Sequence, residues 1–179
     1  MRKFNNRRKL LSKIMGSVDE KKLEEVLGSE EYKIYNALIT AQGAIKLALV
    51  HSEVGISLNE VVLIGYGRIG KVLAKMLLGM NANLTIIETN KIERMNATSL
   101  GFKVLESYSF EKADIVFNTV ENYDLSSTKG LVIDLSSTSK EKINANSLAE
   151  ETATLKEVLY IKEEILLKEE ILGGISNGH

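Results

Sequence analysis

The sequence predicts an α/β fold built on a doubly wound parallel sheet of about five to six strands, with further helices at both ends of the chain. Two observations favour it. Between Glu60 and Ser137, short runs rich in β-branched residues alternate with helical segments, and strands that are apolar on both faces are typical of a parallel sheet covered on both sides. The first such run leads directly into a G-x-G-x-x-G pattern that opens a helical segment. Right-handed crossovers would then join the strands.

The five strands are expected at residues 60–65, 83–88, 102–105, 113–120 and 130–137. Helices are expected between them at 68–80 and 90–101. Asn90 is a favourable N-cap for the second helix, and Gly101 is suited to end it.

The segment before the sheet is expected to be helical. Residues 19–28 end on a glycine, and a longer helix follows Ser29, whose next two residues are acidic. Beyond Thr40 this helix has an apolar face that should pack against the sheet, formed by Ala41, Ala44, Ile45, Leu47, Ala48 and Leu49.

The domain organisation predicted from these patterns has four parts. Residues 1–52 form an N-terminal helical segment, 53–139 a nucleotide-binding domain, 140–172 a C-terminal helical segment and 173–179 a mobile tail. The C-terminal helix would bury one face, either on its own domain or on a partner chain. A homodimer, or a partner subunit bound through the helical ends, is therefore expected.

Composition limits the function. The chain has 179 residues, 23 basic against 24 acidic side chains, and no cysteine, which excludes disulfides, thiolate catalysis and sulfur-based zinc sites. The near-zero net charge makes nucleic acid an unexpected partner, although six Lys and Arg occur in the first thirteen residues. No apolar run is long enough to span a membrane, and no signal-peptide core is evident. A cytoplasmic location is expected.

The glycine pattern has a specific physical reading. Gly65 would make the tight turn, Gly67 would let a pyrophosphate approach the backbone, and Gly70 would let the helix lie close to the strand. The anion would then bind the helix N-terminus, at the amides of Arg68 and Ile69. The alternative is a turn that only joins a strand to a helix.

Glu88 lies at the end of the second strand, where a carboxylate can accept hydrogen bonds from the ribose hydroxyls of a dinucleotide. A 2′-phosphate would be repelled there, so NAD is preferred as the cofactor and NADP remains possible. Lys91 and Arg94 lie nearby and could soften the preference. The alternative is a surface glutamate that caps the next helix.

Polar residues end the fourth and fifth strands. Asn118, Thr119 and Ser136 would face the nicotinamide half of the cofactor, because ligands of open α/β sheets lie outside the carboxyl ends of the strands. Alternatively they are helix caps or turn residues. Asp134, within an apolar run, is interpreted as an internal hydrogen-bond partner.

No catalytic residue can be assigned. His51 ends an expected helix and His179 is the last residue. No His with an adjacent acid, no metal-ligand cluster and no nucleophile with a base is evident, so no metal is expected and a general acid is not identified.

The motifs together resemble a known family. The stretch "YNALITAQGAIKLALV", the segment "VVLIGYGRIGKVLAKML" and the strand ends "FNT" and "IDL" are similar to the C-terminal NAD(P)-binding Rossmann domain of dipicolinate synthase A. Related builds occur in D-2-hydroxyacid dehydrogenases and adenosylhomocysteine hydrolases. The resemblance covers about Tyr35 to Ser137.

The resemblance implies an oxidoreductase that uses a nicotinamide cofactor to oxidise dihydrodipicolinate. It implies that the cofactor is lined by Gly65, Gly67, Arg68, Gly70, Asn118 and Thr119, and that Thr40 lies near the substrate. The family also has a separate N-terminal domain that forms half of the cleft, and this chain is expected to lack a full substrate domain.

A second, looser resemblance leaves another function open. "VLIGYGRIGKVLAKMLL" with "IIETNKIER" looks like the regulatory domains of potassium transport systems, which bind nucleotides without turnover. A nucleotide-responsive regulatory module is therefore the alternative to an oxidoreductase. A relative that keeps the fold without the ligand is a third possibility.

Overall fold

The computed structural model of the chain describes residues 20–52, 55–107 and 109–136. These residues belong to two compact units, one of residues 20–36 and one of residues 37–136. The expectations for the basic N-terminus, the C-terminal helix and the tail lie outside the described residues.

The first unit contains helix α2, Glu20–Gly28, and the start of helix α3, Glu30–His51. Ser29 separates them: its hydroxyl donates to the Val26 carbonyl at 2.7 Å and accepts from the Tyr32 N–H at 3.2 Å. Ser29 therefore caps the N-terminus of α3, as its sequence position predicted.

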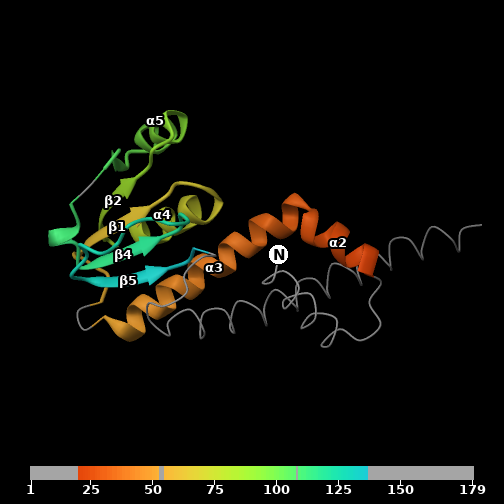
Figure 1. Ribbon diagram of the computed structural model, residues 1–179, viewed down its shortest axis with the longest axis horizontal. Coiled ribbons are helices and arrows are strands. Elements are labelled where there is room, and N and C mark those ends of the chain that lie inside the picture. Colours follow the sequence, from red (N-terminus) through yellow and green to blue (C-terminus); the bar gives the residue numbers. More distant parts are fainter. Residues whose placement is uncertain (1–19, 53–54, 108, 137–179) are drawn as a thin grey trace, which may run out of the picture. The chain divides into compact units, whose positions relative to one another are not determined.

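The second unit is built on five parallel strands in the order β3-β2-β1-β4-β5 (Figure 1). This order places the change in winding direction between β1 and β4, the point where open α/β sheets bind their ligands. The predicted α/β class and parallel sheet are confirmed. The strands are β1 Glu60–Ile64, β2 Asn83–Ile87, β3 Lys103–Leu105, β4 Ile115–Asn118 and β5 Leu131–Asp134.

The last two strands are shorter than predicted. β4 ends at Asn118, because the Asn118 side chain accepts the N–H of Val120 and turns the backbone away from the sheet. β5 ends at Asp134, whose carboxylate accepts the Ser136 N–H in the same way. Both are Asx turns, which compete with the strand ladder for backbone groups.

Two helices connect the first three strands: α4, Arg68–Gly79, and α5, Lys91–Ser99. The predicted cap of α5 is confirmed, because the Asn90 side chain accepts from the Ile92 and Glu93 amides at 2.9 and 3.3 Å. Gly101 follows the helix with a φ of 86°, a backbone conformation that favours glycine.

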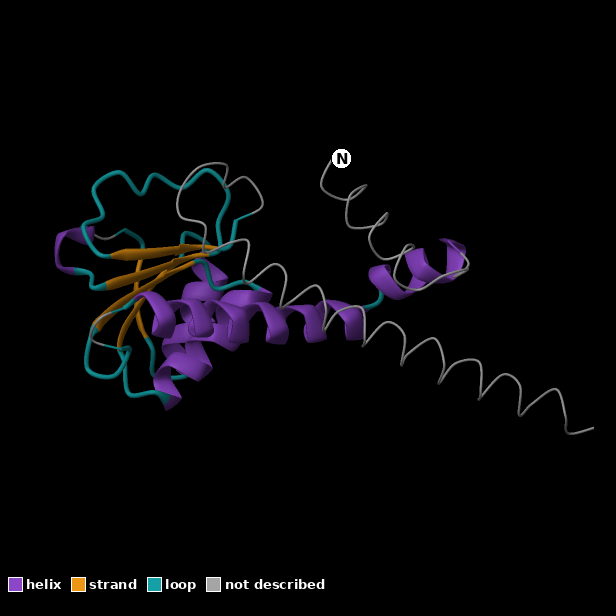
Figure 2. Ribbon diagram, turned by 90° about the horizontal axis from the view of Figure 1, so that it is seen from below, coloured by secondary structure: helices purple, strands orange, loops and turns teal. Residues whose placement is uncertain are grey.

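The two faces of the sheet are covered differently (Figure 2). One face packs on α3 and α4 through a core that includes Leu47, Leu73 and Leu77, and α5 adds Ala97. The opposite face is covered, among the described residues, by loops and the short 3₁₀ helix η1, Phe110–Lys112, rather than by α-helices.

The face of α3 that packs on the sheet is narrower than predicted. Ala41, Ala44 and Ala48 are fully buried in the core, but Leu49 is 50% exposed. The prediction for Leu49 is therefore wrong, since it extended the buried face around the helix beyond the row of small residues that contacts the sheet.

Among the described residues, no helix combines the length and the apolar character that crossing a membrane requires.

Candidate dinucleotide-binding site

The carboxyl edge of the sheet brings the predicted residues of four strands together. Ile64 at the end of β1 is paired with Ile87 in β2 and with Asn118 in β4, and Asn118 is paired with Asp134 in β5. The residues that follow these paired positions therefore lie side by side at the carboxyl edge of the sheet. The glycine loop, Glu88, Thr119 and the end of β5 all belong to it.

Two of the three glycines are required by the fold itself. Gly65 has a φ of 92°, and a Cβ there would overlap Thr119 Oγ1 and lie 2.8 Å from Val120 Cγ2. A Cβ on Gly70 would overlap the Gly65 carbonyl. Gly65 therefore makes the turn and Gly70 lets α4 begin against it, in agreement with the sequence analysis.

Gly67 is not constrained in this way. Its φ of −76° is accessible to any residue, and a Cβ there would meet no heavy atom within 4 Å. The packing of the protein thus gives no reason for a glycine, and the missing side chain leaves open space beside the start of α4.

Helix α4 also begins without a capping side chain. Gly67 is its N-cap residue, no side-chain cap is present and the first turn holds no acidic residue. By contrast, α3 and α5 are capped by Ser29 and Asn90. The positive end of the α4 dipole is therefore available to bind an anion from outside the helix.

Glu88 lies beside this loop, at the end of β2. Its Oε2 accepts the Tyr66 N–H at 2.7 Å and its Oε1 accepts the Asn90 N–H at 2.8 Å. The carboxylate thereby joins the glycine loop to the start of α5. Since each carboxylate oxygen can accept more than one hydrogen bond, Glu88 keeps acceptor capacity for a ligand.

Two cations near Glu88, Arg94 and Lys71, are held by protein groups, whereas Lys91 is exposed at the start of α5. The Arg94 guanidinium donates to the Glu88 and Thr89 carbonyls and lies 3.4 Å from the Glu106 carboxylate. Lys71 of α4 pairs with Glu93 of α5 at 2.8 Å. The hydrogen bond from Lys71 holds the pKa of Glu93 below its usual range.

The Tyr66 side chain is buried in the hydrophobic core and holds the middle of the glycine loop against it. Its ring is 1% exposed, meets Phe102 edge-on at 6.0 Å between centroids, and lies 5.7 Å from the Lys71 ammonium. Burial raises the pKa of the Tyr66 hydroxyl. Tyr66 was not among the predicted site residues, although it lies between the first two motif glycines.

Asn118 lies where predicted, but its amide is engaged by the protein. Its Nδ2 donates to Asp134 Oδ1 and to the Val120 carbonyl, both at 2.9 Å, and its Oδ1 accepts the Val120 N–H at 3.1 Å. The interpretation of Asp134 as an internal hydrogen-bond partner is thus confirmed. The alternative of Asn118 as a turn residue also describes these contacts.

Thr119 and Ser136 flank this pair. Thr119 Oγ1 donates to the Ile64 carbonyl at 2.8 Å, which seats the residue against Gly65. Ser136 is 7% exposed and donates its backbone N–H to Asp134. Thr40 is half-buried on α3; its assignment to a substrate cleft stays a prediction.

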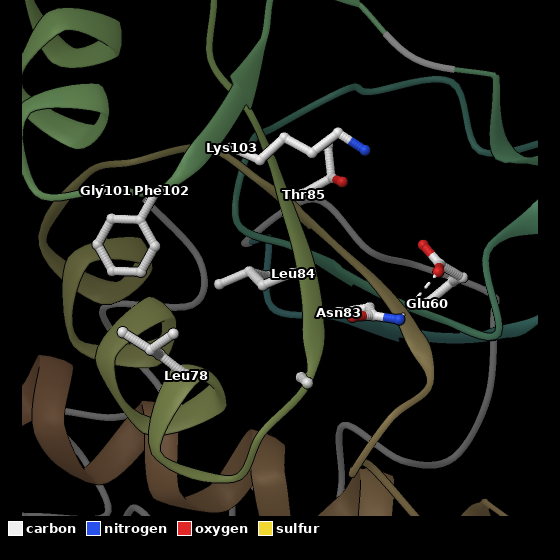
Figure 3. Close-up of a pocket in the computed structure, with 9 residues that line it drawn as sticks. Glu60, Leu78, Asn83, Leu84, Thr85, Gly101, Phe102 and Lys103 are labelled. Carbon is white, nitrogen blue, oxygen red and sulfur yellow. Dashed lines mark hydrogen bonds between the residues drawn. The ribbon is translucent and has the colours of Figure 1, made fainter.

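A separate hollow lies at the opposite, amino-terminal edge of the sheet (Figure 3). Its volume is about 350 Å³. The first residues of three strands, Glu60, Asn83 and Lys103, line it, with Leu78 and Phe102 on its apolar side. Because it lies at the amino-terminal ends of the strands, this hollow is not part of the glycine-loop site at their carboxyl ends. In the part of the chain that the structure describes, no cluster of potential metal ligands occurs.

The chain is similar in sequence to parts of known proteins. No family model matches the chain. Dipicolinate synthase A of Bacillus subtilis is 26% identical over 129 residues, covering 66% of this chain and 43% of that protein. S-inosyl-L-homocysteine hydrolase of Methanopyrus kandleri is 28% identical over 96 residues, covering 53% and 23%. The matched region is less than half of either relative.

Solved structures show the same fold. Dipicolinate synthase A of Bacillus halodurans superposes with a TM-score of 0.64 at 20% identity, over 79% of this chain and 56% of that one. L-tryptophan dehydrogenase of Nostoc punctiforme gives 0.50 at 18% identity, over 65% and 40%. These comparisons give the regulatory-module alternative no support. The chain thus has a Rossmann-like α/β fold and, as the sequence motifs implied, is similar in sequence and in fold to dipicolinate synthase A.

Proposed function

We propose that the unit of residues 37–136 binds a nicotinamide adenine dinucleotide at the carboxyl edge of its sheet. It would be the cofactor-binding part of an oxidoreductase similar to dipicolinate synthase A. The observation that carries the proposal is Gly67: the fold does not need a glycine there, whereas a pyrophosphate needs the space that its missing side chain leaves.

The pyrophosphate would bind at the uncapped start of α4. The amides of Arg68 and Ile69 belong to the first turn of α4, where backbone N–H groups point toward an anion bound at the helix N-terminus. The Arg68 side chain is exposed beside them, so its charge can approach a phosphate from the solvent side.

The adenosine ribose would bind Glu88, and NAD is favoured over NADP for two reasons. The carboxylate of Glu88 accepts hydrogen bonds from the ribose hydroxyl groups but repels a 2′-phosphate. In addition, Arg94 and Lys71, which could neutralise a 2′-phosphate, are already paired with Glu106 and Glu93. Lys91, exposed at the start of α5, could still soften the preference.

The nicotinamide half would lie over the ends of β4 and β5, near Asn118, Thr119 and Ser136. The cofactor would supply hydride transfer, and the chain would supply binding and orientation. A substrate near Thr40 would need cover from beyond this unit. We propose that this cover comes from the segments predicted to be helical at the two ends of the chain, in a homodimer or with a partner subunit.

Calorimetric titration with NAD, NADH, NADP and NADPH tests the proposal. We expect binding of NAD and NADH in the micromolar range, roughly −8 kcal/mol at 1 μM, with the NADP pair at least tenfold weaker. Affinity weaker than about 1 mM for all four would refute dinucleotide binding.

A glycine pair provides the matched variants. Gly67→Ala adds a methyl group to the proposed pyrophosphate space and should abolish binding without loss of stability. Gly79→Ala adds the same group in open space at the other end of α4 and should bind like the wild type. Equal affinity of the two variants would show that Gly67 belongs only to a turn.

Turnover is tested separately, by following nicotinamide absorbance with dihydropyridine dicarboxylates and 2-hydroxy acids as candidate substrates. Cofactor binding with reduction of NAD would establish the oxidoreductase. Binding of the cofactor without its reduction by any of these substrates would limit the function of the chain to cofactor binding.

A further inference from the structure

We infer that Asp134 is a positioning residue for the glycine loop, acting through Asn118 without touching the ligand. The inference rests on the proposed dinucleotide binding and deepens it, because it assigns the polar ends of β4 and β5 to the construction of the site. Asn118 then contributes to affinity by shaping the loop that faces the cofactor.

The first step is the pairing of the two side chains. Asn118 and Asp134 occupy directly paired positions of β4 and β5, so both side chains leave the sheet at the same level. Asp134 Oδ1 accepts the Asn118 Nδ2 at 2.9 Å and also the Ser136 N–H at 3.0 Å. A carboxylate that accepts two donors holds its amide partner in one orientation.

The second step is the turn that this orientation fixes. With Nδ2 directed to Asp134 and to the Val120 carbonyl, Asn118 Oδ1 faces the Val120 N–H. Asn118 is 2% exposed, so water cannot readily replace these partners. The amide therefore closes residues 118–120 into one conformation.

The third step joins the turn to the glycine loop. Thr119 donates both its N–H and its Oγ1 to the Ile64 carbonyl, at 3.0 and 2.8 Å. Thr119 and Val120 also occupy the space that a Cβ on Gly65 would need. The turn thus forms the wall against which Gly65 adopts its positive φ.

The last step reaches the proposed anion site. Gly65 and Gly70 are in backbone contact, so the position of Gly65 sets where α4 begins. A displaced turn at Thr119 would move Gly65 and, with it, the amides proposed to bind the pyrophosphate. Asp134 is therefore linked to those amides by a continuous series of contacts across β5, β4 and β1.

Asp114 provides a matched control. It has the same side chain and also accepts one backbone N–H, from Glu60 at 2.9 Å, but at the amino-terminal edge of the same sheet. Asp134→Ala should weaken NADH binding about tenfold, the size expected when a charged hydrogen bond is lost. Asp114→Ala should leave the dissociation constant for NADH unchanged. It should lower the free energy of unfolding about as much as Asp134→Ala does.

An exchange of the two side chains tests the pair independently of truncation. Asn118→Asp alone places two carboxylates side by side and should weaken NADH binding by more than tenfold. Adding Asp134→Asn restores a donor and an acceptor between the two positions, so the double variant should bind NADH more tightly than Asn118→Asp. Recovery should be partial, because an aspartate at position 118 has no side-chain N–H to donate to the Val120 carbonyl. A double variant as weak as Asn118→Asp would overturn the inference.

Amide hydrogen exchange without ligand separates this inference from dinucleotide binding itself. In Asp134→Ala, the exchange of the Gly65 and Thr119 amides should speed up more than that of the other amides of the sheet, whereas Asp114→Ala should speed up these two amides no more than the others. No selective increase at Gly65 and Thr119 in Asp134→Ala would overturn the positioning role even if NADH binds. Faster exchange in a protein whose wild type fails to bind NADH would refute the proposed function and leave the structural coupling established.

Discussion

The carboxylate of Glu88, at the end of β2, accepts the backbone N–H of Tyr66 in the glycine loop at 2.7 Å. The two residues are 22 positions apart in the chain, and the bond holds the loop against the neighbouring strand. The residue proposed to select the cofactor is therefore also a structural support of the phosphate-binding loop.

Replacing Glu88 should affect both roles. Glu88→Gln presents an amide where two N–H groups need acceptors, so we expect a loss of about 1–3 kcal/mol of unfolding free energy. Discrimination against NADP should fall about tenfold, equal to about 1.4 kcal/mol. Urea unfolding and calorimetric titration measure the two effects. Glu106→Gln, at an exposed carboxylate that pairs with Arg94, is the control and should retain NAD preference.

The two later motif glycines should differ in stability when substituted. Gly70→Ala forces a methyl group onto the Gly65 carbonyl, so overpacking should cost about 1–3 kcal/mol. Gly67→Ala meets open space and should stay within about 0.5 kcal/mol of the wild type. Urea denaturation gives both values, and equal costs would contradict the different environments described for the two glycines.

The ion pair between Lys71 and Glu93 should make stability depend on acid pH. Because the folded-state pKa of Glu93 is lowered, its contribution is present above the unfolded pKa of about 4.3 and is lost as pH falls through the folded value. Glu93→Gln should therefore be less stable than the wild type near neutral pH, by under about 1 kcal/mol for a partly exposed pair. The difference should vanish in acid; a constant difference between about pH 7 and pH 3 would exclude this origin.

The Tyr66 hydroxyl should affect stability in alkali. Burial raises its pKa in the folded protein, so its contribution is complete below the unfolded pKa of about 10 and is lost as pH rises through the folded value. We expect the wild type to lose more stability than Tyr66→Phe between about pH 9 and pH 11. Parallel pH profiles of the two proteins would show that the pKa of the Tyr66 hydroxyl is the same in the folded and unfolded states, and would contradict this prediction.

The sequence determined the elements that depend on local chemistry. Alternating β-branched and helical runs located all five strands of the sheet. Asn90 identified a helix start because an Asn side chain reaches amides only two and three residues ahead. The roles of Gly65 and Gly70 could also be predicted, since a turn from strand to helix places them at fixed spacing.

Only the tertiary structure decided which polar groups remain for a ligand. The amide of Asn118 was predicted to face the cofactor, but strand pairing places Asp134 beside it, 16 residues later in the chain, and engages that amide. The bond from Tyr66 to Glu88 likewise depends on how β1 and β2 lie side by side. Strand register is set by the packing of the whole sheet, so a local pattern shows that a residue is polar and near an edge, whereas the fold determines its partner.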